Sequence, residues 1–265
     1  MSDDPMTLLD AAHVALTADP ENEALRLRFF ERLTDGEMFL LLAQEAQGDT
    51  LEPKVFDLQD GPVVLIFDRE ERLAAFSGGI APYAALPGRV IAGLLRGQGI
   101  GLGVNLGTPA SQMMLPPEAL DWLADTLDEG PQEAEGQPEE FHRPKGLPDA
   151  LLAGLDGKLA RAGGLATAAL LAGVTYLGGR RGHMLAFLDA APGAEAALAR
   201  AASEALVFSG IEAGEIDVAF LRGSDPAAQA MARVALRFDL PDPVRLQGSG
   251  PGAPGMDPKK PPRLI

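Results

Sequence analysis

The chain has 265 residues, a formal net charge of −16 and no cysteine. The absence of cysteine excludes disulfides, thiolate metal ligands and a cysteine nucleophile, and with them a persulfide-carrying sulfurtransferase mechanism. The acidic charge opposes contact with phosphate backbones, so no nucleic-acid partner is expected. At roughly 100–200 residues per domain, the length predicts two domains.

Targeting and membrane signals are weak. The first residues are acidic and form no apolar segment, which predicts no signal peptide and a cytoplasmic location. An uncharged stretch lies between Arg161 and Arg180. It is interrupted by glycines, and a spanning helix needs about 20 apolar residues, so two buried elements of a soluble domain fit it better than a membrane span.

Two helices are predicted at the start of the chain. Thr7 is placed to cap a helix that runs through Ala15. Asp19 and Pro20 are placed to start the second helix, because a carboxylate caps well and proline fits the first helical position. Thr34-Asp35-Gly36 is expected to end it.

Strands and helices then alternate as far as residue 127. The unbroken apolar run Val63–Phe67 predicts a central strand buried on both faces, and Asp68 is placed as the N-cap of the short helix that follows. Other strands are predicted at 38–43, 55–58, 100–106 and 113–115, and other helices after Pro87-Gly88 and after Pro116. This order predicts an α/β domain with a mixed sheet over residues 1–127.

The remaining chain divides into three parts. Residues 128–145 are acidic, aperiodic and rich in proline and glycine, which predicts a linker. Residues 146–240 follow the order helix, strand, strand, helix, strand, helix, strand, and strands at 168–177 and 183–188 share a glycine-rich hairpin turn. This order predicts an α+β domain with an antiparallel-rich sheet and helices on one face. In the tail, 241–265, 11 of 25 residues are Pro or Gly, which predicts disorder.

Three stretches of the first domain together resemble the N-terminal domain of the SseB family, the bacterial "enhanced serine sensitivity" proteins. They are VVLIFDREERLAAF, APYAALPGRVIAGLL, and GIGLGVNLGTP leading to LPPEALDWL. The order of elements from about residue 147 to 240 is similar to the family's C-terminal domain. The resemblance implies a soluble two-domain bacterial protein, linked to a serine-related growth phenotype and associated with a rhodanese-type sulfurtransferase, with no catalytic residue to carry over. Asn105-Leu106-Gly107 departs from the family's usual Asn-Pro-Gly.

Familiar catalytic and metal-binding patterns are missing from the sequence. The three histidines, His13, His142 and His183, have no metal-ligand spacing, so neither a metal nor a cofactor is expected. The glycine-rich run from Gly97 to Pro109 lacks the spacing of a dinucleotide fingerprint and lies along a strand. Ser77 is not in a nucleophile-elbow motif.

Polar residues end two of the predicted strands. If the strands that end at Asp68 and Asn105 are parallel neighbours, then Asp68, Ser77, Gly78, Asn105 and Thr108 line one crevice at the carboxyl ends of the strands. Backbone amides there would favour an anionic or carbonyl-bearing group. The acidic surface of the domain disfavours a highly charged anion, so a zwitterion such as an amino acid fits better than a nucleotide. The alternative is purely structural, with Asp68 capping a helix and Asn105 satisfying loop amides.

The sequence therefore favours a non-enzymatic accessory protein that binds another protein or a small zwitterionic metabolite. The alternative is an enzyme that acts through carboxylates, with Asp68 as the first candidate. The sequence assigns no catalytic residue and no oligomeric state.

Overall fold

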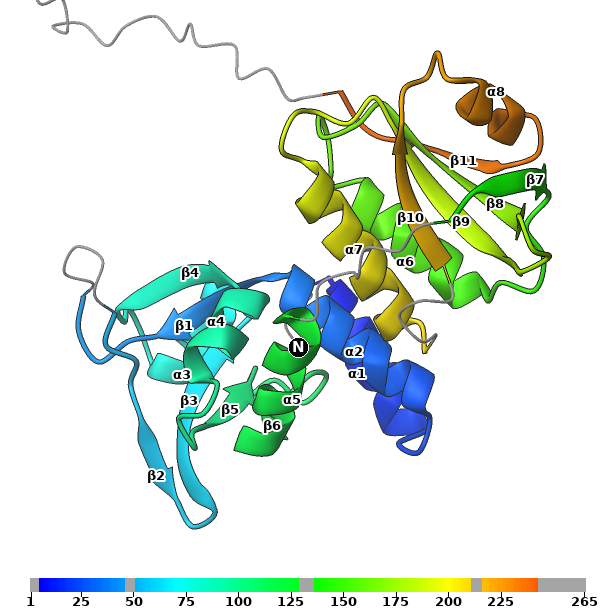
Figure 1. The fold of residues 1–265 in the computed structure, drawn as a ribbon. Helices are drawn as coiled ribbons and strands as arrows, with labels where there is room; N and C mark the ends of the chain where they lie inside the picture. Colours follow the sequence, from blue (N-terminus) through cyan, green and yellow to red (C-terminus); the bar gives the residue numbers. More distant parts are fainter. Residues whose placement is uncertain (1–4, 46–50, 129–135, 211–215, 243–265) are drawn as a thin grey trace, which may run out of the picture.

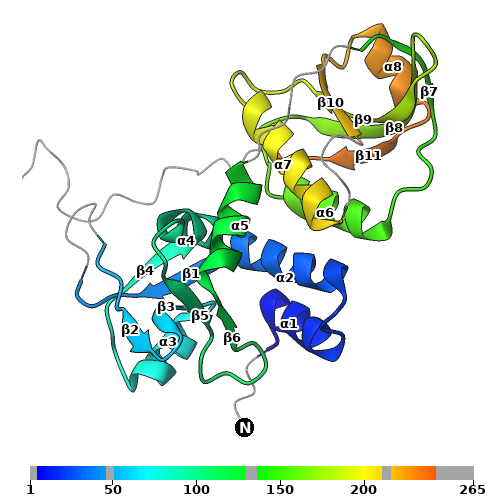
Figure 2. The ribbon, with the colours of Figure 1, turned by 60° about the horizontal axis from the view of Figure 1, so that its bottom comes forward.

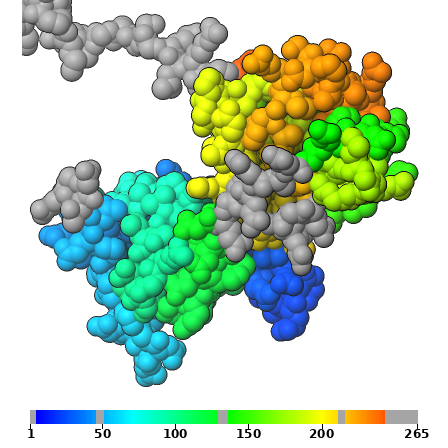
Figure 3. Space-filling model, in the orientation of Figure 1, coloured from blue at the N-terminus to red at the C-terminus, as the bar shows by residue number. Residues whose placement is uncertain are grey.

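The computed structural model describes residues 5–45, 51–128, 136–210 and 216–242, which form two sheets with helices packed on them. Residues 5–45 and 51–128 build the first unit around one sheet, and residues 136–210 and 216–242 build the second unit around the other. Figure 1 shows the two sheets at opposite ends of the molecule, and Figure 3 shows the corresponding two lobes.

The first unit contains a mixed sheet, as predicted. Its strands are β1 (Glu37–Leu41), β2 (Phe56–Leu58), β3 (Gly61–Phe67), β4 (Tyr83–Pro87), β5 (Gly101–Val104) and β6 (Met113–Leu115). They lie in the order β4-β1-β3-β5-β6, and β2 also pairs with β3. Strands β3 and β5 are parallel, while the other pairs are antiparallel. The prediction of a central β3 is confirmed.

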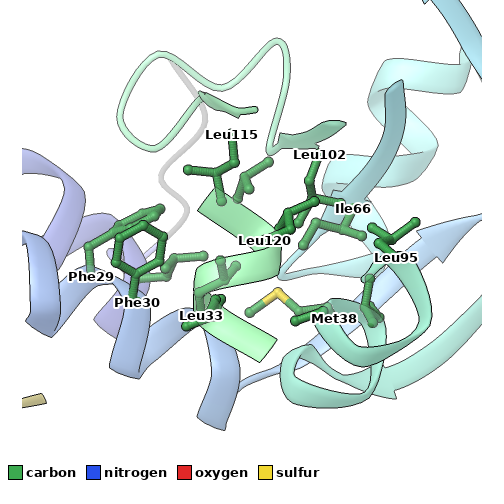
Figure 4. Packing of buried hydrophobic residues seen from close by; sticks show 14 of the residues in the cluster. Phe29, Phe30, Leu33, Met38, Ile66, Leu95, Leu102, Leu115 and Leu120 are labelled. Carbon is green, nitrogen blue, oxygen red and sulfur yellow. The ribbon is translucent and has the colours of Figure 1, made fainter. Parts of the chain in front are cut away.

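Helices cover both faces of this sheet. They are α1 (Leu8–Ala18), α2 (Glu23–Asp35), α3 (Glu70–Ser77), α4 (Gly88–Leu95) and α5 (Pro117–Asp128). Helices α1, α2, α4 and α5 bury one face in the larger core, where Ile66 packs (Figure 4). Helix α3 covers the other face, where Leu73 packs with Leu65 and Phe67. Strand β3 is therefore apolar at successive positions because both of its faces are buried.

The predicted cap of α1 is confirmed. The hydroxyl of Thr7 accepts a hydrogen bond of 3.0 Å from the Asp10 N–H, and the Asp10 carboxylate accepts one of 2.9 Å from the Thr7 N–H. The predicted start of α2 at Asp19-Pro20 is wrong. The Asp19 N–H still donates to Ala15 of α1, and Asn22 caps α2 instead.

Two expectations for the middle of the first unit also need correction. Arg69, not Asp68, is the N-cap residue of α3, because the Asp68 carboxylate is bonded to other side chains. Strand β4 was not expected from the sequence, yet it pairs with β1 along its whole length. It is an edge strand whose residues alternate between exposed and half-buried, so it lacks a continuous apolar run.

The second unit contains an antiparallel-rich sheet, as predicted. Its elements are β7 (Pro138–His142), α6 (Asp149–Leu159), β8 (Ala168–Tyr176), β9 (Arg181–Leu188), α7 (Glu195–Phe208), β10 (Ile216–Leu221), α8 (Pro226–Ala232) and β11 (Leu236–Asp239). The strand order is β10-β9-β8-β11, and β7 also pairs with β8. Only the β9–β10 pair among these described strands is parallel.

The expectation of helices on one face of this sheet is wrong. Helices α6 and α7 pack on one face, and α8 buries Met231 on the other, against Leu170 and Ala186. The predicted linker contains strand β7, in which Phe141 pairs with Val174; its residues 129–135 lie outside the described residues. Of the predicted disordered tail, residues 243–265 lie outside them as well.

The two units contact one another through α2 and α5 of the first and α7 of the second, and α7 lies beside α2 in Figures 1 and 2. Lys158 of α6 also donates to Asp35 of α2. Phe208, at the end of α7, is 4% exposed and belongs to the larger core of the first unit.

Among the described residues, none of the helices combines the length and the apolar character that a membrane span requires.

Candidate functional site

The structure brings three of the five predicted site residues together. Strands β3 and β5 are parallel neighbours, with Ile66 opposite Val104, as the prediction required. The Asp68 N–H donates to the Asn105 side-chain oxygen at 3.0 Å, and the Thr108 N–H donates to the Asn105 carbonyl oxygen at 2.9 Å.

Ser77 and Gly78 lie elsewhere, at the exposed end of α3. Gly78 ends that helix with a left-handed backbone conformation, at a φ of 73°. No hydrogen bond between described residues joins either of them to Asp68 or Asn105. Their predicted part in a shared crevice therefore has no contact to support it.

Side chains of the protein itself fill the carboxyl ends of β3 and β5. Arg72 donates to both carboxylate oxygens of Asp10, at 2.8 and 2.7 Å, and to the Asp68 carboxylate at 2.8 Å. The Thr7 hydroxyl donates to the other Asp68 oxygen at 2.7 Å. Because Thr7 caps α1 and Asp10 lies in its first turn, this cluster holds α1 over the strand ends.

Hydrogen bonds keep the charged groups of this strand-end cluster ionised although they are buried. Asp10 is only 1% exposed. Burial by itself raises the pKa of Asp10, but hydrogen bonds from Arg72, Ser111 and the Thr7 backbone outweigh it and hold the pKa well below its usual range. The pKa of Arg72 is raised, chiefly by its hydrogen bond to Asp10. The pair is therefore fully ionised at neutral pH.

Asn105 has a structural role in this cluster. It is fully buried, its backbone adopts a left-handed conformation with a φ of 48°, and its side-chain N–H donates to the Ser111 hydroxyl at 2.9 Å. This agrees with the structural alternative for Asn105, in which its side chain satisfies a nearby amide. Ligand binding by Asp68, Ser77, Gly78, Asn105 and Thr108 stays a prediction.

A pocket of about 580 Å³ lies where the two units meet. This interface pocket falls in the size range of small-molecule sites, roughly 300–1,000 Å³. The end of α2 and the start of α4 line it from the first unit; the end of α6 and one face of α7 line it from the second. Its charged residues are Asp35, Arg89, Lys158, Arg161, Arg200 and Glu204, and its small residues are Thr34, Pro87, Gly193, Ala196, Ala197 and Ala201.

Two buried carboxylates hold the cations of the interface pocket in place. Asp35 accepts hydrogen bonds from Arg89 at 2.7 Å, from Arg161 at 2.8 Å and from Lys158 at 3.2 Å. Glu204 accepts two from Arg89, at 2.9 and 3.0 Å, and one from Lys158 at 2.9 Å. Each carboxylate therefore pairs with cations from both units.

Cations outnumber carboxylates in the interface pocket by four to two, although the chain as a whole carries a net charge of −16. The Arg89 and Arg161 side chains are 38% and 49% exposed. Arg200 is exposed, and its side chain has no hydrogen-bond or ion-pair partner among the described residues. The accessible part of the pocket therefore carries positive charge.

The chain positions Arg89 by an unusually close approach of two helices. Gly88 begins α4 against the end of α2, and a Cβ atom there would lie 1.9 Å from the Leu33 carbonyl oxygen. The Gly88 N–H also donates to the Gly36 carbonyl at 2.9 Å. Glycine at position 88 therefore lets α4 start next to Asp35.

Sequence reasoning missed this site because its charges come from four separate segments. Each of those segments has an ordinary helical pattern. A weak signal exists in α7 (Glu195–Phe208), where Ala197, Arg200 and Glu204 recur at helical spacing and line the pocket from one face. That pattern alone does not show what the face packs against.

No group of three or more His, Asp and Glu side chains in the described part of the chain is arranged to hold a metal ion. Comparisons of the chain with protein-family models, with curated proteins and with solved structures give no match. The resemblance to the SseB family stays a prediction. The strand-end cluster and the interface pocket are therefore the features from which a function is proposed.

Proposed function

We propose that the protein is a non-enzymatic binding protein that holds a small metabolite in the interface pocket. One observation carries this proposal: a pocket of small-molecule size contains an exposed arginine with no partner among the described residues. In ligand sites a small number of polar groups inside a concave pocket fix the orientation of the ligand, and Arg200 is placed to serve as such a group.

The ionisation of the pocket favours binding over catalysis. Burial raises the pKa of Asp35, but the charges of the three surrounding cations outweigh it and lower the pKa overall. A general acid or base works best when its pKa is near the working pH, and a carboxylate held ionised by three cations does not meet this condition. The Thr34 hydroxyl already donates to carbonyl groups of its own helix, at 3.0 and 3.1 Å.

The hydrogen bonds of Asp68 weaken the alternative of an enzyme that acts through this carboxylate. Both of its carboxylate oxygens accept hydrogen bonds, from Thr7 and from Arg72. The protein partner that the SseB resemblance implies, and the accessory role and cytoplasmic location expected from the sequence, belong to this proposal and are compatible with a ligand-binding pocket.

A thermal-shift and ligand-observed NMR screen of the full chain tests the proposal. The library contains small organic acids, bases, neutral compounds and amino acids at millimolar concentration. We expect at least one class to raise the melting temperature, because a ligand that binds only the folded state stabilises it. The shift should decrease in Arg200→Gln.

Arg28→Gln is the matched control. Arg28 is an exposed arginine in the middle of α2, and it is not part of the pocket lining. Failure of every compound to bind the wild-type chain would contradict the proposed function.

A further inference from the structure

We infer that the interface pocket binds a small organic oxyanion, a carboxylate or a phosphate, and that Arg200 is the residue that binds its acid group. This inference rests on the proposed function and names the chemical class of the ligand. The zwitterion expected from the sequence concerns a different place, the strand ends at Asp68 and Asn105.

The carboxylates of the pocket leave little room for a positively charged ligand group. Both oxygens of Asp35 already accept two hydrogen bonds each. One oxygen of Glu204 accepts two and the other accepts one. The two side chains are 5% and 4% exposed, so an ammonium group of a ligand would find neither a free acceptor nor easy access.

The donors of the pocket, in contrast, are incompletely used. Arg200 has all five N–H groups of its guanidinium available among the described residues. Arg161 uses its N–H groups on the Gly157 carbonyl and on the carbonyl and carboxylate of Asp35, which leaves two of its five. The planar fork of arginine matches the paired oxygens of a carboxylate or phosphate.

The small residues around these donors favour a ligand whose body is short and apolar. Ala196, Ala197 and Ala201 of α7 and Pro87 of the first unit line the pocket and offer no polar side-chain group. They suit a short aliphatic body beside the acid group. The local excess of cations also offsets the repulsion that an anion meets from a chain of net charge −16.

Isothermal titration calorimetry on the full chain tests the inference with four matched probes. Succinate is the carboxylate probe and glycerol 3-phosphate is the phosphate probe. Succinamide replaces the acid groups by neutral amides, and β-alanine replaces one of them by an ammonium group. We expect binding of succinate or glycerol 3-phosphate, at least tenfold tighter than that of succinamide and β-alanine; the tighter of the two anions identifies the acid group.

Variants then assign the binding to Arg200. Arg200→Gln should weaken anion binding at least tenfold, Arg200→Lys should recover part of the loss, and Arg28→Gln should bind as the wild type does. Circular dichroism checks that each variant is folded, which we expect because both side chains are exposed.

The outcomes separate the inference from the proposed function. Preferred binding of succinamide or β-alanine, or anion binding that is unchanged in Arg200→Gln, would overturn the inference and leave a binding protein of another ligand class. No binding by any of these probes would overturn the inference, and no binding across the broader screen would overturn the proposed function as well.

Discussion

Asp35 and Lys158 are 123 positions apart in the chain, and the Lys158 ammonium group lies 3.2 Å from both carboxylate oxygens of Asp35. Each side chain is 5% exposed. The same ammonium group donates to Glu204 at 2.9 Å and lies 5.5 Å from the centre of the Phe208 ring. Lys158 therefore neutralises a carboxylate of each unit at the place where their apolar surfaces also meet.

Lys158→Met should strongly destabilise the protein. It leaves two buried carboxylates with fewer cations, and removal of one partner of a buried ion pair costs about 3–5 kcal/mol of unfolding free energy. Urea denaturation measures the change. Arg237→Met is the control, because Arg237 and Asp239 form an exposed pair, of the kind that contributes about 0–1 kcal/mol. Equal losses in the two variants would contradict a special role for the buried cluster.

Arg72→Met should release α1 from the strand ends. The variant removes the cation shared by Asp10 and Asp68, which are nearly buried. We expect hydrogen exchange in α1 to speed up more than in α5, and a loss of about 3–5 kcal/mol in the free energy of unfolding. Arg26→Met, at the exposed pair with Glu23, should leave exchange in α1 unchanged. Uniform acceleration across the chain would show that α1 is not released by itself.

The stability of the protein should fall in acid below about pH 4. The pKa values of Asp10 and Asp35 are lower in the folded chain than the usual value of about 3.9, so their ionised forms stabilise the fold. This contribution is complete above the unfolded pKa and is lost as the pH falls through the folded pKa. Asp35→Asn should therefore be less stable than wild type at pH 6, and the gap should shrink in acid. Urea denaturation from pH 6 down to pH 2.5 at fixed ionic strength measures it; a constant gap would contradict the prediction.

Substitutions of Asn105 separate its backbone from its side chain. Alanine and glycine both lose the bonds to the Asp68 N–H and the Ser111 hydroxyl. Alanine must also adopt the left-handed conformation, which costs about 1–2 kcal/mol, whereas glycine adopts it readily. Asn105→Gly should therefore be more stable than Asn105→Ala by about 1 kcal/mol in urea denaturation. The reverse order would show that this conformation is not maintained in the variants.

The amino acid site expected at the strand ends has its own test. Calorimetric titration of serine into the wild-type chain and into Asn105→Gly, which keeps the backbone conformation, compares the heats. Heat that disappears in the variant would support a ligand role for Asn105. No heat with either protein would leave Asn105 and Asp68 as structural residues.

The sequence predicted the structure best where a side-chain pattern fits only one kind of environment in a fold. The unbroken apolar run of β3 required cover on both faces, and the structure provides it. Asp68 and Asn105 could be predicted as neighbours because the ends of adjacent parallel strands coincide. Arg72 was not predicted as their partner, since nothing near position 72 indicates that α1 lies over the strand ends.

Features that depend on distant packing escaped prediction. Helix α8 buries only Ala228 and Met231, and such a short apolar stripe fits either face of a sheet equally well. The interface pocket depends on pairs such as Asp35 with Lys158 and Arg89 with Glu204, which join segments of opposite units. Local periodicity contains no information about such pairs.

The close approach of Gly88 to Leu33 limits which residues position 88 can accept without disturbing the interface pocket. A Cβ at position 88 would lie 1.9 Å from a backbone oxygen, so any other residue would force the start of α4 away from α2. Arg89 is the next residue, and it would move with the helix away from Asp35 and Glu204. Gly88→Ala alters no charge and removes no polar group. It would nevertheless have the same effect on the pocket as the loss of Arg89. A descendant of this chain could therefore keep every charged residue of the pocket and still lose the site.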